Sequence, residues 1–238
     1  MSYDFGGTND SFAGDFGEGN ELGYPITIAM WMKFPDHPAA QQTPVNFGVN
    51  DNTVNSSHRM LIGVGDSDNT FFANSVAFGG GSASSNETQT DVDDRWFPVI
   101  AVFRSDASRQ IYVDGTAGTH DTNSRVVAET LRYLRIGENL QGGDEFQFNL
   151  AEVAIWNSDL SLANMDLYEA GTSGDQIDSA NLVGYWSFSA DDLSPDDESG
   201  NGGPTLSAVG TPTFDADHPV ITGGSENTTI TVPTGPHR

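Results

Sequence analysis

The sequence contains no cysteine and a single lysine, Lys33. Without cysteine, a disulfide scaffold, a thiolate zinc site and thiol catalysis are all excluded. Lysine and arginine together number 9 against 34 aspartates and glutamates, which gives a formal net charge of −25. A surface this negative repels phosphate backbones and anionic lipids, so we expect neither nucleic-acid nor membrane partners.

Long apolar runs are also missing. The longest, residues 97–103, is far shorter than the ~20 residues that span a bilayer. The first residues, Met1 to Gly7, contain neither a basic nor an apolar signal region, which predicts that no conventional export signal is present. Because salt screens self-repulsion, the acidic excess favours a marine or saline environment. An acidic protein from any source, kept soluble by its charge, is the alternative.

Period-2 alternation of apolar residues recurs along the chain, whereas helical periodicity is scarce. This pattern predicts an all-β, antiparallel two-sheet sandwich with one short helix. Chains of this size often form a single all-β domain, and we expect one over residues 1–222. The strands are predicted at residues 26–34, 59–64, 71–78, 96–103, 110–113, 134–137, 146–156 and 182–189.

The one predicted helix follows Ser161, a good N-cap, and ends at Gly171. Its residues Leu162, Met165 and Tyr168 share a face, with which we expect it to plug one end of the sandwich. Polar stretches at 79–94 and 189–203 predict surface loops. Residues 223–238 predict an extended tail that a neighbouring subunit would hold.

Several segments resemble a known superfamily. Residues 3–12 (YDFGGTNDSF) are similar to its opening strand and turn, and residues 96–115 to its W-H-H-V-A-V…L-Y-V-D-G hairpin. Residues 134–168 resemble its I-G…G-x-I-D-E-V…L-S…L-Y passage. Over residues 1–206 the chain thus resembles the laminin-G-like, concanavalin A-like lectin/glucanase superfamily. The resemblance implies a jelly-roll sandwich. The block at 182–202, which often precedes the opening strand in that family, here follows the helix and is expected to join the same sheet.

Catalytic patterns are scarce. Glucanases of this fold use closely spaced carboxylates on one strand face, but residues 148–156 offer Glu152 alone. Asp144 and Glu145 precede that strand in a glycine-rich loop and do not share its pleat. The sequence has no G-x-S-x-G elbow and no H-x-x-x-H pair. We therefore predict no catalytic residues and interpret Glu152 as a hydrogen-bonded structural carboxylate.

Two kinds of binding residue remain. Asp66, Asp68 and Asn69 supply the hard oxygen ligands that calcium prefers, and 191–192 with 196–197 form a second acidic group. Solvated acidic loops are the alternative for both. Trp31 and Tyr112 lie opposite the main apolar rows of their strands, which makes them candidates for a ligand face. Packing against another layer is the alternative for them.

These observations predict a non-enzymatic jelly-roll module with a binding or structural role. This fold is common outside cells, yet no export signal is visible. Virion proteins leave the cell by lysis and need no such signal. We therefore predict a protein of a phage or archaeal-virus virion, such as a capsid decoration or tail component. Its partners would be other virion proteins or its own copies, and also glycans. A calcium-dependent lectin from a marine or halophilic microbe is the first alternative. A glycoside hydrolase with an unrecognised carboxylate pair is the second.

Overall fold

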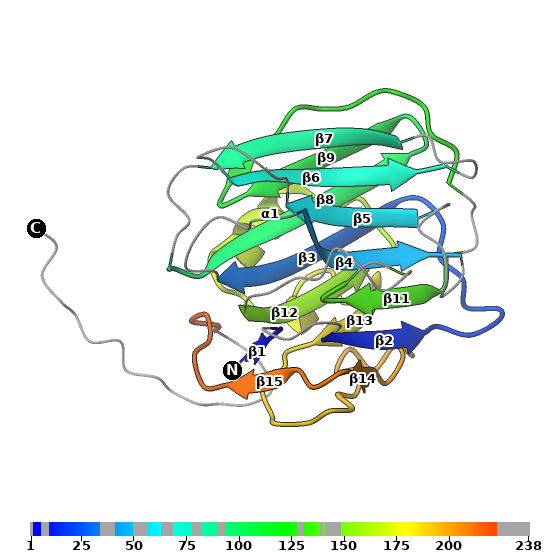
Figure 1. The fold of residues 1–238 in the computed structure, drawn as a ribbon. Coiled ribbons are helices and arrows are strands. Elements are labelled where there is room, and N and C mark those ends of the chain that lie inside the picture. Colours follow the sequence, from blue (N-terminus) through cyan, green and yellow to red (C-terminus); the bar gives the residue numbers. More distant parts are fainter. Residues whose placement is uncertain are drawn as a thin grey trace, which may run out of the picture.

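The computed structural model describes residues 2–5, 10–33, 41–49, 57–62, 69–77, 82–89, 94–127, 131–138, 140 and 149–222. They form two packed antiparallel sheets and one short α-helix (Figure 1). The elements are β1 (Ser2–Asp4), β2 (Ser11–Asp15), β3 (Ile26–Lys33), β4 (Gln42–Gly48), β5 (Ser57–Ile62), β6 (Asn69–Val76), β7 (Ser82–Gln89), β8 (Phe97–Ser105), β9 (Ser108–Val113), β10 (Thr116–Ala117), β11 (Tyr133–Ile136), β12 (Asn149–Trp156), α1 (Leu162–Glu169), the 3-10 turn η1 (Gly174–Gln176), β13 (Leu182–Trp186), β14 (Ser207–Val209) and β15 (Thr213–Asp215).

The chain passes between the two sheets several times, with β4 to β7 together in one sheet and β8 to β10 together in the other. Sheet A has the order β10-β9-β8-β3-β12-β1-β15, with β13 also paired to β12, and sheet B has the order β14-β2-β11-β4-β5-β6-β7. In β1, Tyr3 pairs with Leu150 on one side and with Phe214 on the other, so the beginning and the end of the described chain meet at one edge of sheet A. The predicted all-β two-sheet sandwich is thus confirmed, and β13 joins sheet A as the sequence indicated.

The main core lies between the sheets. In β3, Ile26, Ile28, Met30 and Met32 face inward and are fully buried. β8 is apolar on both faces, and its Val99 and Phe103 join this core while Ile100 and Val102 pack on the other side of sheet A. The prediction of a central strand covered on both faces is therefore confirmed.

A second apolar cluster covers the outer face of sheet A. α1 places Met165 and Tyr168 over Ala29, Trp31 and Trp156. The helix begins at the predicted N-cap, since the Ser161 side chain accepts a hydrogen bond from the Asn164 amide. The expectation that it plugs one end of the sandwich was wrong, because it lies across a sheet face. Leu162 is 65% exposed, so the buried stripe of the helix is narrower than predicted.

A bulge interrupts β12 at Glu152. The residue has a positive φ of 54°, and the pairing with β3 shifts between Ala151 and Ala154. Leu150 and Val153 consequently both face the main core, three residues apart, which strict alternation forbids. The bulge turns Glu152 toward Tyr168 and Tyr185 on the outer face of sheet A.

The sequence prediction missed strands made mainly of polar residues. β7 lies inside the segment predicted as the loop 79–94, because only Ala83 and Ser85 of this edge strand are buried. β4, β14 and β15 were not anticipated either. The hairpin of β5 and β6 is confirmed, as is the tight turn at Asp114 and Gly115, both of which have positive φ. The predicted tail, 223–238, lies outside the described residues.

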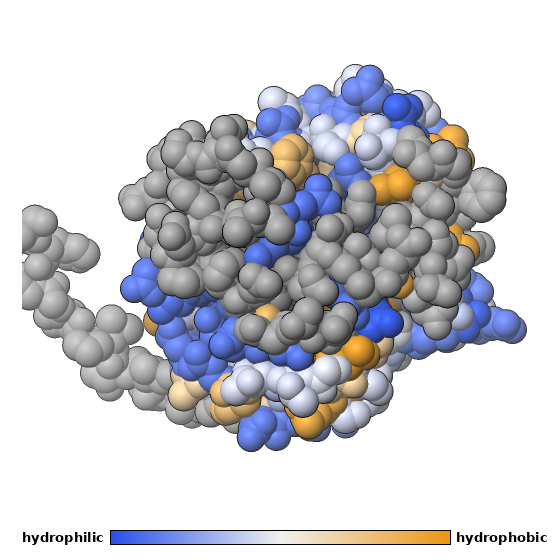
Figure 2. Space-filling model, viewed as in Figure 1, coloured by the Kyte–Doolittle hydropathy of each residue, from blue (hydrophilic) through white to orange (hydrophobic). Residues whose placement is uncertain are grey.

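Hydrophilic residues predominate in the coloured part of the face viewed in Figure 2, which agrees with the acidic composition. Among the described residues, no helix has the length and apolar character needed to span a membrane.

A candidate binding groove on sheet B

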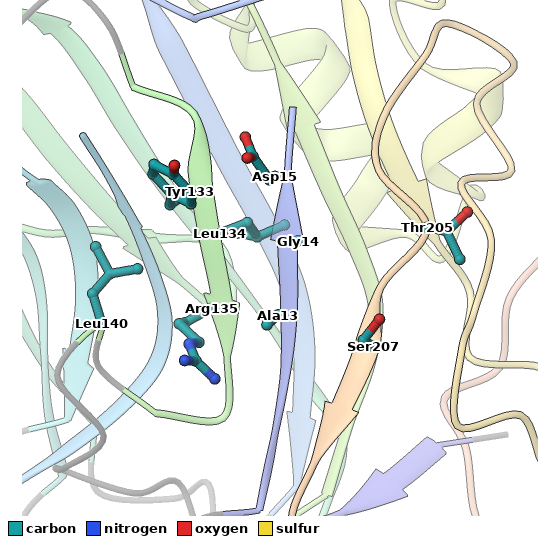
Figure 3. Close-up of a pocket in the computed structure, with 9 residues that line it drawn as sticks. All are labelled: Ala13, Gly14, Asp15, Tyr133, Leu134, Arg135, Leu140, Thr205 and Ser207. Atoms are coloured by element: carbon teal, nitrogen blue, oxygen red, sulfur yellow. The ribbon is translucent and has the colours of Figure 1, made fainter. Parts of the chain in front are cut away.

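A groove of about 460 Å³ lies on the outer face of sheet B, over β2 and β11 (Figure 3). Its volume falls within the roughly 300–1,000 Å³ of small-molecule sites. We call it the β2–β11 groove; its lining residues are Ala13, Gly14, Asp15, Tyr133, Leu134, Arg135, Leu140, Thr205 and Ser207.

The hollow arises from a small residue between two longer ones. Ala13 pairs with Arg135 on β11 and with Ser207 on β14, so the three form one row across the sheet. Figure 3 shows Arg135 and Ser207 on either side of the short Ala13 side chain. The segment before β14 packs closely because Gly14 has no side chain: a Cβ there would lie 2.8 Å from both Pro204 and Leu206.

β11 supplies the other wall because its side chains alternate. Leu134 and Ile136 are buried in the main core, whereas Tyr133 and Arg135 are partly exposed on the outer face. The Arg132 guanidinium carbon lies 4.8 Å from the centre of the Tyr133 ring. Arg132 therefore covers one face of this ring, and a sugar ring can stack only on the opposite face.

Asp15, at one end of the groove, is held by Arg132. Arg132 donates from Nε to Oδ1 at 2.8 Å and from Nη2 to Oδ2 at 2.6 Å. These hydrogen bonds hold the pKa of the Asp15 carboxyl below its usual range. The carboxylate is therefore ionised at neutral pH and presents an acceptor to the groove.

Buried polar residues next to the groove fix the position of Arg135. Its Nη1 donates to Glu138 Oε1 at 2.9 Å, and Ser11 Oγ donates to the same oxygen at 2.6 Å. Glu138 is only 2% exposed, while the Arg135 side chain is 18% exposed. The pair thus hides the carboxylate and presents the guanidinium.

Glu152, the one strand carboxylate that the sequence singled out, does not open onto this groove. Glu152 is 7% exposed, and its carboxylate accepts a hydrogen bond from the Tyr185 hydroxyl. Its backbone oxygen accepts a hydrogen bond from the Tyr168 hydroxyl. Burial raises its pKa to about 8. The interpretation of Glu152 as a hydrogen-bonded, buried carboxylate agrees with the structure.

Trp31 and Tyr112 face away from the main core, as predicted, but each is only 8% exposed. Both belong to the second apolar cluster, and the centres of the Trp31 and Tyr168 rings are 6.4 Å apart. This burial supports a packing role. Ligand binding by these two residues stays a prediction.

The predicted calcium ligands Asp66 and Asp68 lie outside the described residues, and Asn69 is described only as the first residue of β6. In the second acidic group, Asp197 accepts hydrogen bonds from the amides of Tyr185 and Gly203, which favours a role in ordering that loop. Within the described part of the chain, no three histidine, aspartate or glutamate side chains gather as a metal site. Calcium binding stays a prediction.

The groove residues were missed by the sequence interpretation. A signal was available: in R-Y-L-R-I-G (132–137), polar and apolar residues alternate, and two of the chain's eight arginines stand three residues apart. The sequence does not show that β11 pairs with β2, because the residues of β2 lie more than 100 positions away along the chain.

Three solved structures of differing origin illustrate what this chain is similar to. The ligand-binding domain of botulinum neurotoxin serotype D, in complex with N-acetylneuraminic acid, is 11% identical over 71% of this chain and 41% of that one, with a TM-score of 0.51. Full-length tailspike protein 2 from an Escherichia coli bacteriophage is 12% identical over 70% of this chain and 24% of the tailspike chain, with a TM-score of 0.51. A pentraxin from Limulus polyphemus is 13% identical over 66% and 80%, at 0.46.

At this identity the likeness shows the fold alone, and this chain spans less than half of the neurotoxin and tailspike chains. No curated protein matches the sequence. The family profile described as the concanavalin A-like lectin/glucanases superfamily matches residues 7–165, two thirds of the chain. Together with the two-sheet sandwich, this match shows that the chain belongs to the concanavalin A-like lectin/glucanase superfamily.

Proposed function

We propose that this protein is a non-enzymatic attachment module that binds carbohydrate in the β2–β11 groove. The observation that carries the proposal is that Tyr133, Asp15, Arg135 and Ser207 line one groove, which brings an aromatic ring, a carboxylate, a guanidinium and a hydroxyl to the same surface. Sugar recognition needs this combination of an apolar ring face and fixed hydrogen-bonding groups.

The absence of catalysis is part of the proposal. Glycoside cleavage needs two carboxyl groups about 5–9.5 Å apart on either side of the scissile bond. The groove offers Asp15, which is ionised and engaged by Arg132, and Glu138 lies buried behind Arg135. The groove therefore does not present two free carboxyl groups to a ligand, which supports binding without hydrolysis.

The setting that we propose is the surface of a virion, with other virion proteins or further copies of this chain as partners. The use of this architecture in a phage tailspike supports the proposed setting. Genes for capsid or portal proteins beside this gene would support the setting; neighbours that encode only secreted polysaccharide-degrading enzymes would contradict it.

The binding experiment uses a variant in which a large side chain fills the groove. In Ala13→Trp, the indole would occupy the space between Arg135 and Ser207, and glycan binding on an array should be lost. Ala117→Trp is the matched control, because Ala117 is exposed on β10 at the edge of the other sheet. Equal binding by both variants would contradict the proposal.

Two further measurements distinguish the alternatives. Loss of glycan binding on addition of EDTA would favour the calcium-dependent lectin. Release of reducing ends from a bound polysaccharide, abolished in Glu152→Gln, would favour the hydrolase. For the proposed module, we expect chelator-insensitive binding and no released reducing ends.

A further inference from the structure

We infer that the β2–β11 groove selects a sugar that carries a carboxylate, and that Arg135 binds this carboxylate. The inference rests on the proposed carbohydrate-binding function and adds the chemical class of the ligand. It follows from the opposite polarity of the two ends of the groove, where Arg135 and Asp15 line the same hollow.

At the Arg135 end, one edge of the guanidinium is already engaged and another is open. Among the described residues, the hydrogen bonds of this side chain both use Nη1, which lies 2.9 Å from Glu138 Oε1 and 3.4 Å from Ser11 Oγ. Among the described residues, Nε and Nη2 have no partner. These two nitrogens form a planar fork that matches both oxygens of a carboxylate.

The fixed position of Arg135 makes this fork selective. Glu138 and Ser11 are almost completely buried and hold Nη1 from behind, so the guanidinium is oriented before any ligand arrives. A preorganised fork loses less side-chain entropy on binding than a free one. A neutral hydroxyl can use only one of the two open nitrogens well, whereas a carboxylate uses both.

At the other end, Asp15 requires a donor. Its Oδ1 accepts from Arg132 Nε and from the Gly17 amide, while Oδ2 accepts from Arg132 Nη2 alone in the contacts of the described residues. Asp15 lies opposite Tyr133 and Arg135 lies opposite Ala13, so the two residues are diagonal neighbours about 7–8 Å apart at their bases, and Figure 3 shows their side chains directed toward opposite ends of the groove. An oligosaccharide that contains a sugar acid can span this separation, with its carboxylate accepting at Arg135 and a hydroxyl of a neighbouring sugar unit donating to Asp15.

The test compares acids with their neutral counterparts on the wild-type full-length chain. Trigalacturonate, an alginate trisaccharide and sialyllactose are titrated by calorimetry, each beside its carboxyl-reduced form, at an ionic strength that screens the repulsion from the net charge of −25. We expect at least one acid to bind, and its reduced form to bind about tenfold or more weakly, as for the loss of a charge-assisted hydrogen-bonded pair. Equal affinity for the acid and its reduced form would overturn the inference while leaving the groove proposal intact.

Variants assign the effect to Arg135. Arg135→Lys keeps the positive charge beside Glu138 but removes the fork, so the preference for the acid should fall while the melting temperature changes little. Because Arg135→Gln alone would leave Glu138 unpaired, it is combined with Glu138→Gln. Arg104→Gln, on sheet A and paired with Asp159, is the matched control and should keep the preference. A preference unchanged in Arg135→Lys would overturn the assignment, and binding of no saccharide, acidic or neutral, would overturn both proposals.

Discussion

The buried carboxyl of Glu152 should make the stability of this protein fall as the pH rises from acidic to neutral values. Burial beneath Tyr168 and Tyr185 raises its folded-state pKa to about 8 from an ordinary value of 4.5. Between these two values, the unfolded chain releases the proton and the folded chain keeps it. The free energy of unfolding therefore decreases with rising pH across this window, and the contribution of the protonated form is lost above about pH 8.

The magnitude follows from the two pKa values. Each pKa unit is equivalent to ~1.4 kcal/mol, so the difference amounts to about 5 kcal/mol over the whole window. Glu152→Gln removes the ionisable group and keeps an acceptor for the Tyr185 hydroxyl. Relative to the wild type, the variant should gain several kcal/mol of stability at pH 8 compared with pH 4.5.

Urea unfolding at pH 4.5, 6 and 8, at constant ionic strength, measures this difference. Glu18→Gln is the matched control, because Glu18 is exposed and its replacement relieves the same unit of net charge without touching the buried site. Parallel pH profiles for the wild type and Glu152→Gln would refute the reasoning.

Three other predictions concern charge and burial. His58 is fully buried and stacked on Phe103, and burial lowers its pKa from 6.5 to about 3, so stability should fall as the pH drops from 6.5 toward 3. His58→Gln should remove about 3 kcal/mol of this dependence between pH 7 and pH 4, and an unchanged acid limb in urea titrations would contradict it. Asp121→Asn should destabilise the fold by about 3–5 kcal/mol, because the fully buried Arg109 loses its ion-pair partner, and a loss below 1 kcal/mol would show that the pair carries little. At a net charge of −25, the melting temperature should rise between 0.05 and 1 M NaCl, and a flat or falling curve would count against self-repulsion as a limit on stability.

Local pattern was sufficient to predict those elements whose side chains alternate between apolar and polar or carry a turn signal. β3, β8 and the Asp114–Gly115 turn belong to this group. β7 escaped prediction because an edge strand needs few apolar residues, and only Ala83 and Ser85 of its eight residues are buried. The bulge at Glu152 escaped because it depends on how β12 meets its neighbours, not on a glycine in the sequence.

For the candidate site, the sequence directed attention to large aromatic residues on the polar faces of strands. Trp31 and Tyr112 do point away from the main core, but both are buried in the second apolar cluster, where Tyr168 of α1 packs near Trp31. A strand's alternation states which side chains share a face and leaves open whether another element lies over that face. Tyr133 and Arg135, in a shorter and less conspicuous strand, remain partly exposed, and the residues paired with Arg135 and Tyr133 include the short Ala13 and Gly48.

The sequence by itself determined the architecture and the chemistry that is missing. The spacing of apolar residues is a local property that any two-sheet packing must respect, and the absence of cysteine and the charge of −25 hold whatever the fold. Only the tertiary structure decided where a ligand could bind, because the β2–β11 groove joins Asp15, Arg135 and Ser207 from three distant segments. Their proximity depends on strand pairing across long stretches of chain, which no short stretch of sequence encodes.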